Sequence, residues 1–171
     1  IPFEFEGIPV GNLTYGHRFL GKNPVSIEII DEYEEKLREN YVILDQNERR
    51  DEIVFQSKHL AKSLGGEIES DEDLLTELTY IVEYPTAILG EIKPEYLKLP
   101  PIVITTPMRE HLRYIPVYDQ KGELLPYFIT IRNGNDEYTD IVVRGNERVL
   151  GARLEDAKFF YEEDLQAPLV D

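Results

Sequence analysis

A long helical pattern near the end of the chain is the strongest constraint on the fold. Apolar residues recur there at spacings of four and three, which places them on one stripe of a helix: Leu150, Leu154, Ala157, Tyr161 and Leu165. Charged residues fall on a second stripe: Arg144, Arg148, Glu155, Lys158 and Glu162. The pattern predicts a long amphipathic helix over about residues 136–165, leading into a following domain. Three consecutive aromatic residues, Phe159, Phe160 and Tyr161, wrap more than one side of a helix, so we expect them to dock on another domain.

The rest of the chain mixes helical and extended patterns. Residues 1–20 are predicted to be extended, and residues 31–40 to form a short helix. A longer helix should start at a capping box at 45–48 and stop at Gly65-Gly66. A third helix should follow a Ser70 cap and reach about residue 82. Short strands are predicted at 41–44 and 86–89, one helical turn at 94–97, and a β-hairpin from 114–118 and 125–132. Residues 102–112 combine strand-like Ile102-Val103-Ile104 with helix-like Met108, His111 and Leu112, and stay ambiguous. These patterns predict an α+β fold over 1–171 as a single domain, with a mixed sheet and a β-hairpin, packed by several helices and closed by the long C-terminal helix.

Charge and composition limit the function. The formal net charge of -16 opposes nucleic-acid binding, which depends on Lys and Arg. The bases gather between about residues 105 and 153, however, so a local positive patch remains open, although solvated helix faces are the more common reason for such charge blocks. The chain has no Cys and no apolar run of about 18 residues, so we expect a cytoplasmic protein with no membrane contact.

Two short motifs could contact an anion or a partner. Gly16-His17-Arg18 places a guanidinium beside a glycine, although a hydrogen-bonded structural role for His17 is more common than catalysis. The Arg109, His111 and Arg113 run mixes basic and aromatic residues, as expected where a nucleotide stacks, but an amphipathic connector would look similar. Further basic candidates lie in the C-terminal helix: Arg144, Arg148 and Arg153. If these residues bind RNA, we expect Arg109, Arg113 and Arg148 on one accessible face.

Motifs for catalysis are absent from the sequence. It lacks the GxxxxGK[ST] phosphate loop, HExxH, Cys-His zinc spacing, the GxSxG elbow and a His-Asp dipeptide. We therefore predict no catalytic residue, no metal site and no cofactor within this chain.

Several stretches together resemble a known family. The run from Gly145 reads GNERVLGARLEDAKFFYEED, and upstream stand YGHRFL at 15–20, IVEYP at 81–85, TTPMREH at 105–111 and GELLPYFI at 122–129. They resemble the beta chain of the bacterial two-subunit (alpha/beta-type) glycyl-tRNA synthetase over nearly the whole chain. Leu112 and Ile115 replace the usual Gln and Phe, and Gly151 replaces a common Arg, which removes one positive charge.

The resemblance implies an internal fragment of a longer beta chain within an ATP-dependent aminoacyl-tRNA synthetase. It implies that ATP and Mg belong to the alpha chain, and that the beta chain contributes tRNA positioning and assembly. The expected partners are the alpha chain, glycine tRNA and other beta-chain domains. Two alternatives remain: hydrolysis of mischarged tRNA using His17 or His111 with Thr105 or Thr106, and a purely structural interaction module.

Overall fold

A three-stranded antiparallel sheet forms the centre of the protein. The computed structural model describes residues 3–166, and its central strand is β7 (Leu124–Asn133), flanked by β5 (Pro85–Glu91) and β6 (Ile115–Tyr118). Leu89 pairs with Ile129 on one side, and Ile115 pairs with Ile129 on the other. The predicted hairpin is therefore confirmed as β6 and β7. Its turn is closed by Asp119, whose side chain accepts hydrogen bonds from the backbone N–H groups of Lys121 and Glu123.

Helices cover both faces of this sheet. Successive strand residues point to opposite faces, so the neighbours Phe128 and Ile129 of β7 enter two different cores. The core containing Ile129 lies against α2 (Gln46–Ser63) and α3 (Glu72–Ile81), with Ile53, Ala61, Leu74, Leu78, Val82, Ile115 and Val117. The core containing Phe128 lies against the C-terminal helix, with Ile92, Tyr96, Leu99, Ile104, Met108, Tyr114, Leu150 and Leu154. The α+β class is confirmed.

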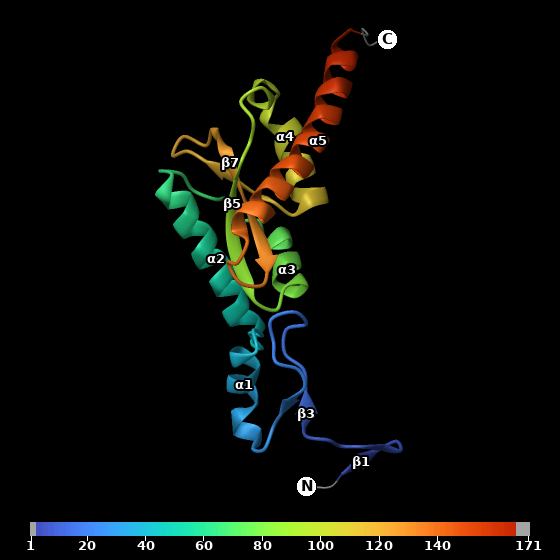
Figure 1. Ribbon diagram of the computed structural model, residues 1–171. Coiled ribbons are helices and arrows are strands. Elements are labelled where there is room, and N and C mark those ends of the chain that lie inside the picture. The colour runs from blue at the N-terminus through green and yellow to red at the C-terminus, as the bar shows by residue number, and fades with distance from the viewer. Residues whose placement is uncertain (1–2, 167–171) are drawn as a thin grey trace.

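The long C-terminal helix is α5 (Thr139–Gln166). It crosses the sheet beside β5, and its last turns project beyond the sheet (Figure 1). The predicted apolar stripe is confirmed for Leu150 and Leu154, which are buried, whereas Leu165 at the far end is exposed. Leu165, in the last described turn, therefore lies beyond the core that Leu150 and Leu154 join.

The ambiguous segment is helical throughout. After η2 (Tyr96–Lys98), the chain forms α4 (Pro101–Thr106) and continues directly into the π-helical turn η3 (Pro107–Leu112). Pro107 has no N–H for an α-helical hydrogen bond, and widening of the helix at this point accommodates that loss. Ile104 and Met108, one turn apart, are both buried in the core with α5, and this packing favours the helix over the strand.

An N-terminal arm, residues 3–30, extends away from the sheet (Figure 1), although its Leu20 lies close to Gly134, the residue after β7. It contains two short antiparallel ribbons, β1 (Glu4–Phe5) with β2 (Ile8–Pro9) and β3 (Leu13–Thr14) with β4 (Val25–Ser26). After it come η1 (Ile30–Glu32) and α1 (Tyr33–Glu39), which confirm the short acidic helix. Many large apolar side chains of the arm are exposed: Phe3, Phe5, Ile8, Val10, Leu13, Tyr15, Phe19, Ile29 and Ile30.

Two local predictions were wrong. Residues 41–44 form no strand, because Tyr41 has a positive φ of 61° and no neighbouring strand pairs with the segment; the Ile43 N–H instead donates to the Glu83 carbonyl. The N-cap of α3 is Asp71 rather than Ser70, since the Asp71 carboxylate accepts from the Leu74 N–H. The Asp45 cap of α2 is confirmed, although its Glu48 pairs with Arg38 instead of closing the box.

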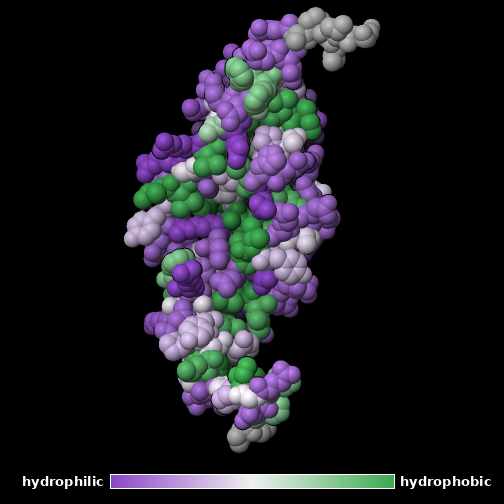
Figure 2. Space-filling view, turned by 90° about the vertical axis from the view of Figure 1, so that its right-hand side faces the viewer, coloured by the Kyte–Doolittle hydropathy of each residue, from purple (hydrophilic) through white to green (hydrophobic). Residues whose placement is uncertain are grey.

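Hydropathy varies over the surface. Figure 2 shows hydrophobic residues gathered along the middle of one face, with hydrophilic residues on both sides. No helix among residues 3–166 is both long and apolar enough to cross a membrane.

Candidate functional site

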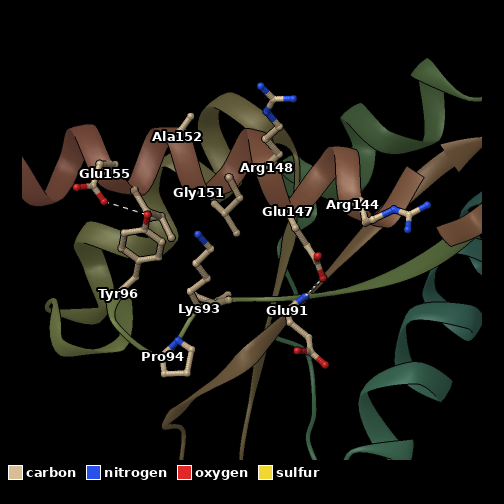
Figure 3. A pocket seen from close by; sticks show the side chains of 13 residues that line it. Glu91, Lys93, Pro94, Tyr96, Arg144, Glu147, Arg148, Gly151, Ala152 and Glu155 are labelled. Carbon is tan, nitrogen blue, oxygen red and sulfur yellow. Dashed lines mark hydrogen bonds between the residues drawn. The ribbon is translucent and has the colours of Figure 1, made fainter. Parts of the chain in front are cut away.

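One face of α5 forms the wall of a cavity of about 590 Å³. Arg144, Glu147, Arg148, Gly151 and Glu155 line it, at the spacing that places residues on one side of a helix. The floor comes from the segment after β5, which contributes, among others, Ile92, Lys93, Pro94 and Tyr96 (Figure 3). The cavity therefore lies between two segments that are about 50 residues apart in the sequence.

Three cations border this cavity. They are Lys93, Arg144 and Arg148, all exposed, and none forms an ion pair with another residue in the part of the chain that the structure describes. In Figure 3 the Lys93 side chain rises toward Gly151, whereas the Arg148 guanidinium points away from the floor. The sequence prediction thus found Arg144 and Arg148 but missed Lys93, because no local pattern connects it with α5. Arg153 is exposed but does not line the cavity.

The acidic side chains of the cavity hold α5 in place. Glu147 Oε1 accepts a hydrogen bond of 3.0 Å from the Glu91 backbone N–H. Tyr96 donates from its phenol to Glu155 Oε2, also at 3.0 Å. Burial of Tyr96, and to a lesser extent this bond to a carboxylate, raises the pKa of Tyr96 to about 12. Glu147 and Glu155 therefore have structural partners.

Gly151 leaves room on the cavity side of α5. A Cβ placed there would meet no atom within 4 Å, so a Cβ at this position causes no steric clash. The absence of a side chain at 151 therefore keeps the centre of the cavity wall open, at a cost in helix propensity of up to about 1 kcal/mol.

The Arg109 and Arg113 side chains bind acidic groups of the same chain. Arg109 forms ion pairs with Glu69 and with Asp71, the latter at 3.9 Å, and also donates to the Tyr118 hydroxyl. Burial opposes the charge of Arg109, but the Glu69 hydrogen bond and the neighbouring charges outweigh it, so the pKa of Arg109 is raised. Arg113 Nε lies 2.7 Å from Glu77 Oε2.

The three arginines expected to share one accessible face, Arg109, Arg113 and Arg148, differ in their pairing. Arg109 and Arg113 are paired with carboxylates, whereas Arg148 lies on α5 beside the cavity. His111, between the two paired arginines, is exposed. A contact of any of these residues with RNA stays a prediction.

His17 organises a loop. Its ring is 3% exposed, and its Nδ1 accepts from the backbone N–H groups of Phe19 and Leu20, each at 3.3 Å. The buried Nε2 atom has no hydrogen-bond partner in the described residues. Gly16 packs so closely that a Cβ would lie 2.4 Å from Asn40 Cβ. This geometry matches the structural role that the sequence favoured for His17.

The same loop presents Arg18 outward. The Arg18 guanidinium carbon lies 5.4 Å from the ring centre of Phe19, which is 82% exposed. Arg18 thus remains available to a partner, while His17 is enclosed.

The groups proposed for hydrolysis do not line one common cavity. Thr105 and Thr106 line a separate cavity with Asp73, Glu77 and Glu110, and His111 is not among its lining residues. His17 belongs to the loop after β3, where it holds the backbone. Within residues 3–166, no group of three or more His, Cys, Asp or Glu side chains is placed to hold a metal ion.

The aromatic end of α5 is divided between core and solvent. Tyr161 packs against the core that contains Leu150, whereas Phe159 and Phe160 are exposed, with their ring centres 5.6 Å apart in an edge-to-face arrangement. Docking of these residues on another domain stays a prediction.

Comparisons with known proteins identify the family. A family model described as the glycyl-tRNA synthetase beta subunit matches residues 1–171. The glycine–tRNA ligase beta subunits of Moorella thermoacetica and Clostridioides difficile are each 53% identical over 169 residues, which is 99% of this chain and 24% of each relative. That of Desulfitobacterium hafniense strain Y51 is 52% identical over 171 residues, 100% of this chain and 25% of the relative. The chain spans about a quarter of the length of these curated relatives. On this evidence, the chain belongs to the glycyl-tRNA synthetase beta subunit family.

Proposed function

We propose that this chain is part of a cytoplasmic glycine–tRNA ligase and positions glycine tRNA through the cations beside α5. Its family membership supports a place in glycyl-tRNA synthesis. The observation that carries the RNA contact is the cluster of Lys93, Arg144 and Arg148, which lacks ion pairs within the described residues of a chain with a net charge of -16. Unpaired Lys and Arg side chains are the groups that release counterions from phosphate.

In this proposal the chain contributes binding rather than chemistry. ATP, Mg²⁺ and formation of the glycyl adenylate belong to the alpha chain, which is the partner of the beta chain in the assembled enzyme. The support within this chain is that Tyr96 and two acids of the cavity have structural partners: Tyr96 donates to Glu155, and Glu147 accepts from the Glu91 N–H. These hydrogen bonds would keep the surface that binds tRNA in a fixed conformation.

A salt series tests the RNA contact. Fluorescence anisotropy would measure the affinity of the assembled ligase for glycine tRNA in parent, Arg148→Ala and Arg113→Ala forms. Arg148→Ala should weaken binding and lower the dependence of log affinity on log salt by about 0.7 to 0.9 for one lost phosphate contact. Arg38→Ala is the matched control, because Arg38 pairs with Glu34 and Glu48 and does not line the cavity.

Arg113→Ala compares the two candidate surfaces. If Arg113→Ala weakens tRNA binding as much as Arg148→Ala does, the RNA contact would lie nearer the η3 segment. Arg113 would then have to leave Glu77 to reach RNA. Unchanged affinity in both variants would refute the proposed role of these arginines.

The N-terminal arm favours a second candidate function in assembly. Its exposed Tyr15, Arg18 and Phe19 are residue types enriched in protein interfaces, and several aliphatic side chains of the same arm are also exposed. Replacement of Phe19 by Ser would then reduce association with the alpha chain or with other beta-chain domains, measured as the mass of the complex by light scattering. Unchanged assembly would contradict this role.

A further inference from the structure

We propose that the outer face of α2 is a second RNA contact, on which an unpaired base stacks while neighbouring phosphates bind two lysines. We call it the basic-aromatic face of α2 and define it as Phe55, Lys58, His59 and Lys62. The inference rests on the proposed function, since it presumes that this chain meets tRNA. It concerns residues outside the α5 cavity.

Helix geometry brings these four side chains together. Their spacing of three, four and seven residues places them on one side of α2, with about 5–6 Å between neighbouring Cβ atoms. Ile53, Ser57 and Ala61 are buried on the side that packs toward the sheet. The basic-aromatic face therefore points away from the core, and all four of its residues are exposed.

The two rings form a ready platform. Phe55 is 66% exposed, and its ring lies 6.3 Å from that of His59, at an interplanar angle of 23°. A flat aromatic surface in water suits a nucleobase, because every base has a π-face that can stack. Stacking would cover apolar area that the fold of this chain leaves in contact with solvent.

The charge around the platform fits an anionic strand. Acidic residues make up 34 of the 171 residues, about one in five, yet none occurs from residue 53 to residue 66. Lys58 and Lys62 form no ion pair with any residue from 3 to 166. Asp51 and Glu52, one turn before Phe55, are the nearest acids along the helix, and Glu52 accepts a hydrogen bond from the side chain of Gln56.

Acids from other elements near Lys58 are already paired. Lys58 shares a cavity wall with Glu69, Asp71 and Glu72. Glu69 and Asp71 bind Arg109, and Glu72 binds Arg50, so these carboxylates are partly neutralised. An acidic protein could bind the lysines, but it would leave the ring of Phe55 without a partner, whereas RNA uses both features.

Substitutions in the full-length beta chain of the assembled ligase test this contact. Phe55→Ala should weaken the affinity for glycine tRNA by about 5- to 100-fold, as expected for one stacked base, with little change in salt dependence. Phe55→Trp, which keeps an aromatic ring, should bind glycine tRNA about as tightly as the parent does. Replacement of both Lys58 and Lys62 by Gln should lower the salt slope by about 1.4, or about 0.7 for each phosphate of a single strand.

Two controls match these variants. Tyr80→Ala removes a 63% exposed aromatic residue from α3, and Lys36→Gln removes a lysine that is paired with Glu32; both should bind tRNA as the parent does. Circular dichroism would verify that each variant is folded.

The outcomes separate this inference from the proposed function. If Arg148→Ala weakens tRNA binding while the α2 variants bind as the parent does, the inference is refuted and the proposed function stands. If the α2 variants alone weaken binding, the inference is supported and the role of the α5 cations fails. A loss of subunit assembly in Phe55→Ala, with tRNA affinity unchanged, would identify a protein partner and overturn the RNA contact.

Discussion

The phenol of Tyr96 donates a 3.0 Å hydrogen bond to Oε2 of Glu155, and so joins the turn after β5 to the middle of α5. Tyr96 is 4% exposed, and its ring belongs to the core that contains Phe128 and Leu150. This bond lies at the edge of the cavity, where it fixes the distance between its floor and its wall.

Loss of this bond should destabilise the protein modestly. Tyr96→Phe keeps the buried ring but removes the donor, and hydrogen bonds to charged groups contribute about 1.5–3 kcal/mol. Because Glu155 is exposed and can bind water instead, we expect the low end of that range. Urea denaturation would measure it. Tyr138→Phe is the control, since Tyr138 is exposed, and an equal loss in both variants would contradict the argument.

Stability should fall at alkaline pH through the same residue. The pKa of Tyr96, about 12 in the folded protein, lies above the usual value of about 10, so the folded state holds this proton more tightly than the unfolded state. The contribution is fully present below about pH 10 and is lost as pH rises through 12. Comparison of unfolding free energies of parent and Tyr96→Phe should show the gap between them narrowing over this range. A constant gap would disprove the assignment.

The His17 loop should not tolerate a side chain at position 16. In Gly16→Ala the new Cβ would lie 2.4 Å from Asn40 Cβ, so the backbone must shift. We expect a loss of about 1–3 kcal/mol, typical of overpacking, measured by thermal or urea unfolding. Gly11→Ala, where the nearest atom would be 4.0 Å away, should change stability far less.

Position 151 offers a gain of function. Gly151→Arg introduces the residue that the family resemblance leads us to expect at this position. Its Cβ would stand in open space, on the cavity that Lys93 and Arg148 also line. Helix propensity predicts up to about 1 kcal/mol of added stability. The added cation should also tighten tRNA binding and steepen its salt dependence. Gly151→Gln separates the two effects, because it should stabilise α5 similarly without raising the affinity.

Long patterns were read correctly from the sequence, and short ones less so. The stripe of α5, the stop of α2 at Gly65 and the β6–β7 hairpin each involve many residues that agree with one another. Residues 41–44 and 102–104 looked like strands by composition, but a strand needs a neighbour with free backbone groups. Neither segment has one, and the second packs as a helix on α5.

The residues of the candidate surfaces follow the same rule: those that share a helix face could be found from the sequence, and those brought together by packing could not. Arg144 and Arg148 could be found from sequence because they share a helix face, and the spacing of Phe55, Lys58, His59 and Lys62 carried the same kind of signal. Lys93 could not be found, since only the packing of α5 beside β5 brings it near Arg148. The pairing of Arg113 with Glu77 was equally hidden, because 36 residues separate them.

By itself, the sequence determined the longer helices, the hairpin, the family and the excess of negative charge, because each depends on local spacing, motif content or composition. The tertiary structure alone decided which charges remain available to a partner. Ion pairing depends on distances of a few ångströms between segments far apart in the chain, and only packing on the two faces of the sheet sets those distances.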